Sequence, residues 1–209
     1  MDLLSCLAHQ RFDENRGGFK AIAHVQCGVV VRVQRFGEHR PMPWTNGRGT
    51  SYEVVRGGGD DWSWRVAIAP VMEDGPFSSL PGVDRWLAVI DDAPIVLAID
   101  GAECVAHRGE VVAFAGESQV TAHLPGGPTR DCGLMVRRGA ATGCMHVAGP
   151  GRVEGTVLVA LERAIVRTAG QEEDLGPGDA LLSDEPFDAQ IVAGRVVVVT
   201  VTTTLPAND

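Results

Sequence analysis

The chain has 209 residues, 44% of them hydrophobic, and a formal net charge of −9 at pH 7. Such a chain is long and apolar enough to bury a core, as one large domain or two small fused ones. Its acidic balance, with no basic stripe to reverse it locally, disfavours nucleic acid as a partner. The longest apolar runs fall far short of the ~20 residues that cross a bilayer, so no membrane partner is expected either.

Residues 1–28 carry scattered charges around one short apolar stretch, without the basic region and cleavage site of a signal peptide. Strand patterning begins only near Val29. We therefore expect residues 1–28 to form an N-terminal extension that could be disordered.

Strand patterns dominate the rest of the chain, and helical periodicity is almost absent. Alternating or continuous β-branched runs occupy residues 29–36, 50–55, 62–69, 85–90, 94–99, 110–114, 118–124, 133–138, 156–168, 179–183, 187–192 and 195–203. Turns rich in Gly, Pro and Asp separate them, as in all-β barrels and sandwiches. The sequence predicts an all-β protein with very little helix.

A weak internal repeat relates the two halves of the chain. Arg108-Gly109-Glu110 precedes a buried strand in the first half, and Pro177-Gly178-Asp179 does so about 69 residues later. A glycine followed by an acidic residue is a frequent turn device of jelly-roll barrels. We therefore predict two fused cupin-like barrels, the first over residues 29–148 and the second over 149–209, with the option of strands exchanged between them.

The five cysteines are odd in number and include no CxxC pair, which disfavours a disulfide framework and a zinc knuckle and fits a reduced, cytoplasmic setting. Cys132 follows Asp131, whose charge would raise the pKa of the thiol. A nucleophilic role for Cys132 is therefore not expected.

Two turn-rich segments, residues 43–53 and 74–85, hold polar side chains around glycines and prolines that fix the backbone. Such rigid polar turns are typical of binding sites. Together with downstream residues they carry a resemblance. The matching segments are Pro43-Trp44, Asn46-Gly47, Gly49-Thr50, Glu53, Trp64-Arg65, Asp74-Gly75-Pro76-Phe77-Ser78, Pro81-Gly82, Asp84-Arg85, Phe114, Gly116, Asp131, Met135 and Arg137-Arg138.

These motifs resemble the HutD/Ves family of bicupin proteins, built from two RmlC-like jelly-roll barrels, whose HutD members are associated with bacterial histidine utilisation. The resemblance implies a binder or regulator of a pathway metabolite, with no settled enzymatic activity. The chain departs from the family pattern at Thr45, Arg48 and Gly133, where Lys, Gly and Asn are usual. Ligand identity could shift accordingly.

Many cupins bind a metal through two closely spaced histidines, a carboxylate and a third histidine. This chain has no His-x-His pair, and the corresponding turn reads Phe77-Ser78-Ser79-Leu80. We therefore expect no metal and no other cofactor. His123 alternates with Thr121 and could face the barrel interior, where a lone histidine is more often a hydrogen-bonded core residue than a ligand.

Arg65 is the leading candidate for ligand binding. Alternation places it on one strand face with Ala67 and Ala69, which leaves room for a planar anion beside its guanidinium. The fork of an arginine suits a carboxylate. The alternative is an exposed or ion-paired arginine, with Glu53 as its partner.

The complete set of candidate ligand-binding residues is Asn46, Thr50, Glu53, Arg65, Ser78, Arg85, Phe114 and His123. No nucleophile-elbow sequence is present, and no catalytic residue is assigned. The set predicts a metal-free protein that binds a small carboxylate metabolite. The resemblance to the HutD/Ves family implies that this protein regulates histidine utilisation, with urocanate or a formylated or formiminated glutamate as the candidate ligand.

The alternative is a metal-independent lyase, isomerase or hydrolase with Glu53 or His123 as its base. A purely structural module is disfavoured by the polar residues on the two turns. Edge strands of a bicupin could pair between subunits, so a homodimer is an open option.

Overall fold

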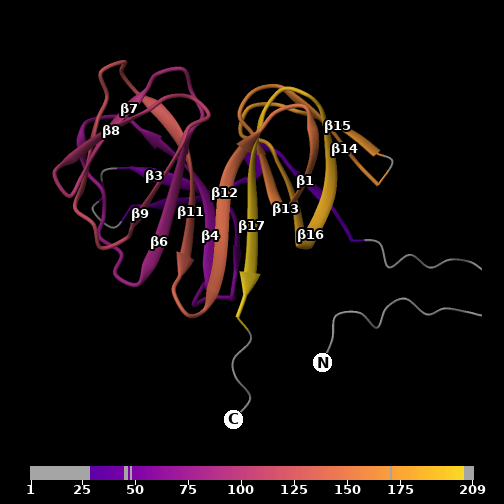
Figure 1. Ribbon diagram of the computed structural model, residues 1–209, viewed down its shortest axis with the longest axis horizontal. Coiled ribbons are helices and arrows are strands. Elements are labelled where there is room, and N and C mark those ends of the chain that lie inside the picture. The colour runs from indigo at the N-terminus through magenta and orange to yellow at the C-terminus, as the bar shows by residue number, and fades with distance from the viewer. Residues whose placement is uncertain (1–28, 45–46, 48, 170, 205–209) are drawn as a thin grey trace, which may run out of the picture.

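The computed structural model describes residues 29–44, 47, 49–169 and 171–204. Figure 1 shows two lobes of β-structure lying side by side, with β4, β11, β12 and β17 between them. The only helical element in the described residues is the short 3-10 turn η1 (Phe36–Glu38). The prediction of an all-β protein with very little helix is confirmed.

The first lobe contains two antiparallel sheets. The six-stranded sheet has the order β2 (Arg40–Pro43), β3 (Thr50–Gly57), β4 (Trp64–Val71), β11 (Thr129–Arg137), β6 (Val83–Val89) and β9 (Val111–Ala115). The four-stranded sheet has the order β5 (Gly75–Pro76), β10 (Val120–His123), β7 (Ile95–Ile99) and β8 (Ala102–Ala106). A buried cluster that includes Leu87, Leu97, Phe114 and Val120 joins the two sheets.

The second lobe is one seven-stranded sheet in the order β12 (Ala141–Ala148), β17 (Val196–Thr203), β13 (Gly151–Ala160), β16 (Ala180–Ala193), β14 (Ala164–Thr168) and β15 (Gln171–Leu175). The seventh strand, β1 (Arg32–Gln34), lies outside this order and pairs with β16. Both β1 and β12 precede residue 149, so this sheet also takes strands from the first part of the chain.

The largest buried cluster lies between the lobes. Val66 and Ile68 of β4 and Leu134 of β11 pack with Val157 and Val199 from the second lobe. Each such side chain contributes about 1.5 to 3 kcal/mol when fully buried. Because side chains alternate along a strand, the opposite face of β4 and β11 turns toward the interior of the first lobe, and the packed face holds it in place.

The predicted run over residues 156–168 is wrong as a single strand. β13 ends at Ala160, and β14 begins at Ala164 after a turn through Leu161, Glu162 and Arg163. The sequence analysis also missed β2, β5, β8, β12 and β15, which are short, polar or glycine-containing.

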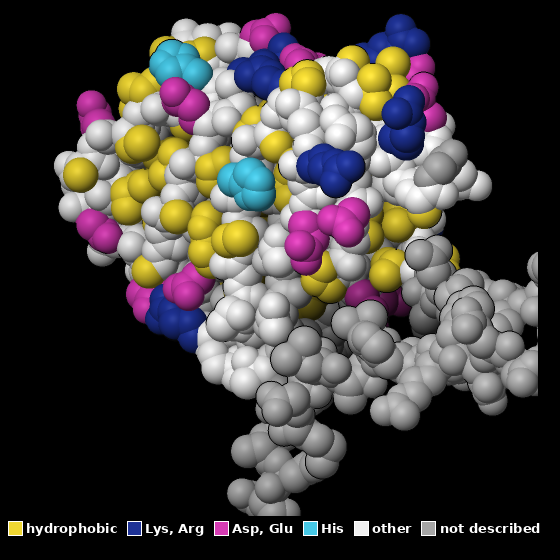
Figure 2. Space-filling model, turned by 45° about the vertical axis from the view of Figure 1, so that its right-hand side comes forward, with side chains coloured by type: hydrophobic (Ala, Val, Ile, Leu, Met, Phe, Trp, Pro, Cys, Tyr) yellow, Lys and Arg dark blue, Asp and Glu magenta, His cyan; other side chains and the backbone are white. Residues whose placement is uncertain are grey.

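Charged side chains of both signs lie next to one another on the face drawn in Figure 2. Arg138 pairs with both Asp84 and Glu117, and Arg163 pairs with Asp174. Exposed pairs of this kind contribute little to stability individually. Within the described part of the chain, no helix has the length and apolar character needed to cross a bilayer.

Candidate functional site

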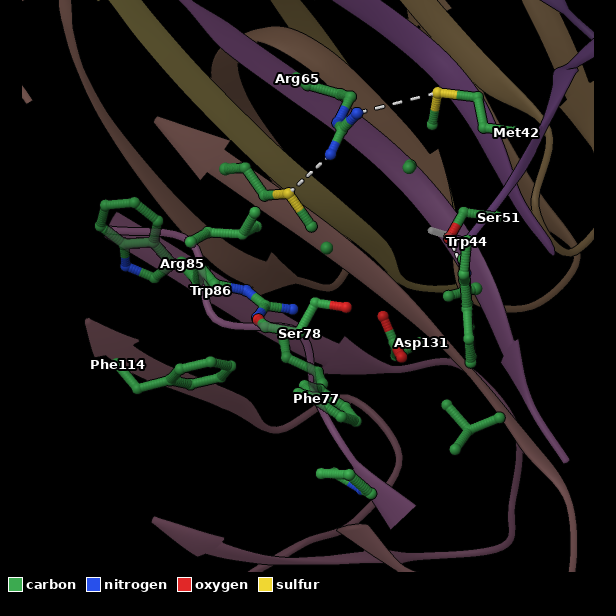
Figure 3. Close-up of a pocket in the computed structure, with 18 of the residues that line it drawn as sticks. Met42, Trp44, Ser51, Arg65, Phe77, Ser78, Arg85, Trp86, Phe114 and Asp131 are labelled. Carbon is green, nitrogen blue, oxygen red and sulfur yellow. Dashed lines mark hydrogen bonds between the residues drawn. The ribbon is translucent and has the colours of Figure 1, made fainter. Parts of the chain in front are cut away.

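The first lobe contains a cavity of about 230 Å³, lined mainly by strands of its six-stranded sheet. A cavity of this size suits a small metabolite. Figure 3 shows side chains from both turn-rich segments projecting into it. The lining residues that carry polar or aromatic groups are Trp44, Ser51, Arg65, Phe77, Ser78, Arg85, Trp86, Phe114 and Asp131.

Arg65 lies on β4 with its guanidinium in the cavity (Figure 3). Its Nη2 lies 3.2 Å from Sδ of Met135 and its Nη1 3.8 Å from Sδ of Met42, and its buried Nε has no hydrogen-bond partner among the described residues. The guanidinium also stacks 4.7 Å from the ring centroid of Trp62. Burial lowers the pKa of Arg65, and the charge of Glu53 opposes this. Since thioethers are weak acceptors, a ligand oxygen would be a better partner for this group.

Arg85 enters the same cavity from β6. Its guanidinium carbon lies 5.0 Å from the ring centroid of Phe114 and 5.3 Å from that of Phe77, and its Nη1 donates to the backbone carbonyl of Ser78 at 3.2 Å. Burial lowers the pKa of Arg85, while the nearby charge of Asp131 raises it. Stacking on two aromatic rings fixes the fork and leaves other N–H groups for a ligand.

Asp131 on β11 is the one carboxyl group among the described lining residues, and its residue is only 5% exposed. Burial raises the pKa of Asp131 to about 7, although the charge of Arg85 opposes this. No described residue donates a hydrogen bond to this carboxyl or forms an ion pair with it. The sequence analysis used Asp131 as a neighbour of Cys132 and as part of the family resemblance but not as a ligand-binding candidate, so its place in the cavity was missed.

The cavity floor is made of small residues. Ala67 and Ala69 of β4 and Gly133 of β11 lie beside one another in the sheet and leave the space above them open. Trp44 forms part of the wall and donates from Nε1 to the Ser51 hydroxyl at 2.7 Å. The expected small-residue face around Arg65 is therefore present.

Four of the predicted ligand-binding residues, Arg65, Ser78, Arg85 and Phe114, line this one cavity. Thr50 and Glu53 do not line it. Glu53 is buried, with Oε1 3.7 Å from Nε of Arg56 and with Oε2 lacking a hydrogen-bond partner among the described residues. Asn46, and the departures Thr45 and Arg48, lie outside the described residues.

The expectation that His123 faces the barrel interior is wrong. Its side chain is exposed, and its Nδ1 lies 3.2 Å from Oδ2 of Asp74. Val120 and Ala122 of the same strand fill the core, so alternation turns His123 outward. Neither of the two residues considered as a catalytic base, Glu53 and His123, lines the cavity.

Cys132 lies on the opposite face of β11, in the core between the lobes. Burial raises the pKa of its thiol, and the charge of Asp131 raises it further, as predicted. Among the described residues, no group of three or more His, Cys, Asp or Glu side chains is arranged to hold a metal ion.

Comparison with known proteins gives a family and a fold. The model of the HutD family matches residues 37–199. An uncharacterised 21.2 kDa protein of the hutC 3′ region of Pseudomonas putida is 35% identical over 109 residues, which are 50% of this chain and 57% of that protein. The chain thus matches little more than half the length of this relative.

Solved structures extend the likeness to the whole fold. HutD from Pseudomonas fluorescens, determined in a formate condition, is 29% identical with a TM-score of 0.73 over 84% of this chain and 100% of its own. A cupin 2 conserved barrel protein from Leptotrichia buccalis is 6% identical with a TM-score of 0.51, over 79% of this chain and 96% of its own. The second likeness concerns the fold alone, which is cupin-like.

Proposed function

The chain belongs to the HutD family, and from that premise we propose that it binds a small carboxylate metabolite in the cavity of its first lobe. The observation that carries the proposal is the half-buried guanidinium of Arg65, whose Nε is fully buried and whose described hydrogen-bond acceptors are two thioether sulfurs. A carboxylate would supply charged acceptors in a sheltered site, where such hydrogen bonds are strong. Ser78 and Arg85 lie in reach of the same ligand.

We propose further that the ligand is an intermediate of histidine degradation and that its binding tunes the flux or expression of that pathway. Urocanate, N-formylglutamate and N-formiminoglutamate are the candidates. Support comes from the family and from the position of the Pseudomonas putida relative in a hutC region.

We interpret the two lobes as a bicupin in which β1 and β12 pass between barrels, an interpretation that the two-lobed sheet pairing supports. We place the protein in the cytoplasm. The absence of disulfides among Cys104, Cys132 and Cys144 supports that setting.

A thermal-shift panel of these three metabolites, with acetate as a minimal carboxylate, tests the proposal. A ligand present at 100 times its Kd stabilises the folded state by about 2.7 kcal/mol, which is a rise of several degrees in melting temperature for a chain of this size. The rise should disappear in Arg65→Met. The absence of any shift across the panel would contradict the proposal.

The rival function is a metal-independent enzyme. It requires a base near the ligand, and Glu53 and His123 both lie outside the lining residues. The described geometry therefore gives those two assignments no support. Turnover of a panel compound by the purified protein would favour the enzyme and would require a different base.

A further inference from the structure

We propose that the ligand carries an N–H or ammonium donor in addition to its carboxylate, and that Asp131 accepts a hydrogen bond from this donor across the space left open by Gly133. The inference rests on the proposed function, because it takes Arg65 as the site of the carboxylate. It goes further in naming the chemical class of the ligand and the residue that selects it.

The first observation is the isolation of the Asp131 carboxyl. It is buried and projects into the cavity, yet no described residue donates a hydrogen bond to it (Figure 3). Arg85, on the neighbouring strand, forms no ion pair with it and donates instead to the carbonyl of Ser78. The carboxyl oxygens are not enclosed by protein but open onto the cavity, so a partner for them has to come from the cavity side. A sheltered carboxyl without a donor is costly, and nearly all buried polar groups in proteins have a partner. A ligand donor would supply the missing partner.

The second observation is that nothing in the backbone requires glycine at position 133. Gly133 lies within β11, paired with Ala67 and Leu87, and its φ is not in the left-handed region. A Cβ at this position would meet Oδ1 of Asp131 at 3.6 Å and the carbonyl oxygens of Trp86 and Ala67 at 3.7 and 3.9 Å. These are ordinary contacts. Glycine weakens a strand interior, so its presence here leaves open space next to Asp131 at a cost to the strand.

The third observation is the distribution of charge. Arg65 and Arg85 offer cationic groups to a carboxylate, whereas Asp131 offers the only carboxyl among the described lining residues. A ligand that placed a second carboxylate against Asp131 would meet like-charge repulsion. A ligand with an apolar end would leave Asp131 unpaired, and sites with an unpaired buried polar group discriminate strongly against such ligands. At pH 8, where the Asp131 carboxyl is ionised and only accepts hydrogen bonds, a donor is the group that fits.

Two probes of equal chain length distinguish carboxylate binding at Arg65 from donor binding at Asp131. Pentanoate has a carboxylate alone, and 5-aminopentanoate adds an ammonium. Binding at pH 8 can be followed by tryptophan fluorescence, because Trp44 and Trp86 line the cavity and Trp62 stacks on Arg65. The parent protein should bind 5-aminopentanoate about ten- to a hundredfold more tightly than pentanoate.

Asp131→Asn, which keeps the size of the side chain, should reduce this preference by about tenfold or more, because an amide cannot form the charged hydrogen bond. Gly133→Ala should also reduce it while leaving the melting temperature unchanged or higher, since the added Cβ has room and favours the strand. A fall in binding without a fall in stability separates ligand selection from a structural role.

Three outcomes would overturn the inference. The first is equal binding of the two probes by the parent protein, and the second is a preference that survives unchanged in folded Asp131→Asn. If pentanoate binding still depends on Arg65 in either case, the proposed function stands and only this inference fails. The third is that neither probe binds, which would overturn the inference together with the proposed carboxylate site.

Discussion

The Nη2 atom of Arg65 lies 3.2 Å from the Sδ atom of Met135, so a half-buried guanidinium donates to a thioether instead of to a carboxylate. The Arg65 N–H groups therefore face weak acceptors, and the Nε–H has no acceptor among the described residues. Burial already lowers the pKa of Arg65, which means that the surroundings do not fully compensate its charge. An anion that enters the cavity would compensate the charge of Arg65.

Arg65→Met should therefore weaken binding of whichever metabolite gives the largest thermal shift. A charge-assisted hydrogen bond in a sheltered site is worth about 1.5 to 3 kcal/mol, so we expect a loss of roughly ten- to a hundredfold in affinity. Arg65→Lys should recover only part of the loss, because an ammonium cannot reproduce the bidentate fork. Isothermal calorimetry measures both.

Arg56→Met is the matched control. Arg56 pairs with Arg65 in register on the neighbouring strand but does not line the cavity. Its loss should change affinity far less than the loss of Arg65. The melting temperature of each apo variant shows whether a lost signal reflects unfolding. Tight binding by folded Arg65→Met would show that the carboxylate lies elsewhere.

The sequence could predict that Arg65 lines a cavity because three successive positions on one face of its strand are free of large apolar side chains. Arg65, Ala67 and Ala69 alternate with large apolar residues, and the structure places all three in the cavity lining. The same rule, applied without reference to which residues fill the core, failed for His123. Val120 and Ala122 are 4% and 1% exposed, and a strand with these residues inside must present His123 outside.

Asp131 was missed because its strand was predicted to begin at residue 133, whereas β11 begins at Thr129. The period-two pattern does extend that far, since Asp131, Gly133 and Met135 alternate with buried Cys132 and Leu134. No feature of the sequence, however, indicates that Arg85 would leave this carboxyl without an ion pair, because that depends on the stacking of Arg85 on two aromatic rings.

Two truncations test the role of the start of the chain. Deleting residues 1–28 should leave the melting temperature nearly unchanged, because strand pairing in the described chain begins at Arg32. Deleting residues 1–36 should lower it substantially, because β1 pairs with β16 and because Asp179 accepts hydrogen bonds from Nη1 of Arg35 and the backbone N–H of Phe36. Thermal melts followed by circular dichroism compare the two. A large fall on removing residues 1–28 alone would mean that this segment stabilises the barrels.

His39 should make the protein sensitive to mild acid. Its ring is buried between the lobes, with Nε2 donating to the carbonyl of Gly178 at 2.9 Å and Nδ1 without a partner among the described residues. Burial lowers the pKa of His39 below its usual 6.5, although the Gly178 carbonyl and the charges of Asp179 and Glu38 oppose this. The unfolded state therefore binds a proton at a higher pH than the folded state does. The contribution of the neutral His39 ring to the free energy of unfolding is fully present above about pH 6.5. It is lost as the pH falls through the pKa of His39 in the folded protein.

His39→Gln tests this, because glutamine can still donate to Gly178 and does not titrate. Urea unfolding between pH 5 and 8 should show that the free energy of unfolding of the parent falls more than that of the variant as the pH is lowered. The exposed His123 provides the control substitution, His123→Gln. A parent and a His39→Gln variant whose stability difference is independent of pH would contradict the assignment.

Asp131 should act on stability in the opposite direction. Its pKa is about 7 in the folded protein against a usual 3.8, because burial disfavours the charged form. The charged groups that share the cavity are Arg85 from β6 and Arg65 from β4, and only Arg85 lowers the pKa of Asp131. Between pH 3.8 and 7 the folded state holds a proton that the unfolded state has released. The free energy of unfolding should therefore fall as pH rises through this range, by at most roughly 4 kcal/mol.

Asp131→Asn removes this dependence, so the variant should match the parent near pH 4.5 and exceed it in stability at pH 8. The comparison is best made in the His39→Gln background, since His39 titrates in an overlapping range with the opposite sign. Asp188→Asn, at an exposed position of β16, is the matched control and should show no such gain. Urea unfolding at several pH values measures each difference. Should Asp131→Asn be no more stable than the parent at pH 8, the carboxyl is compensated by a group outside the described residues, and the ligand donor assigned to it loses its support.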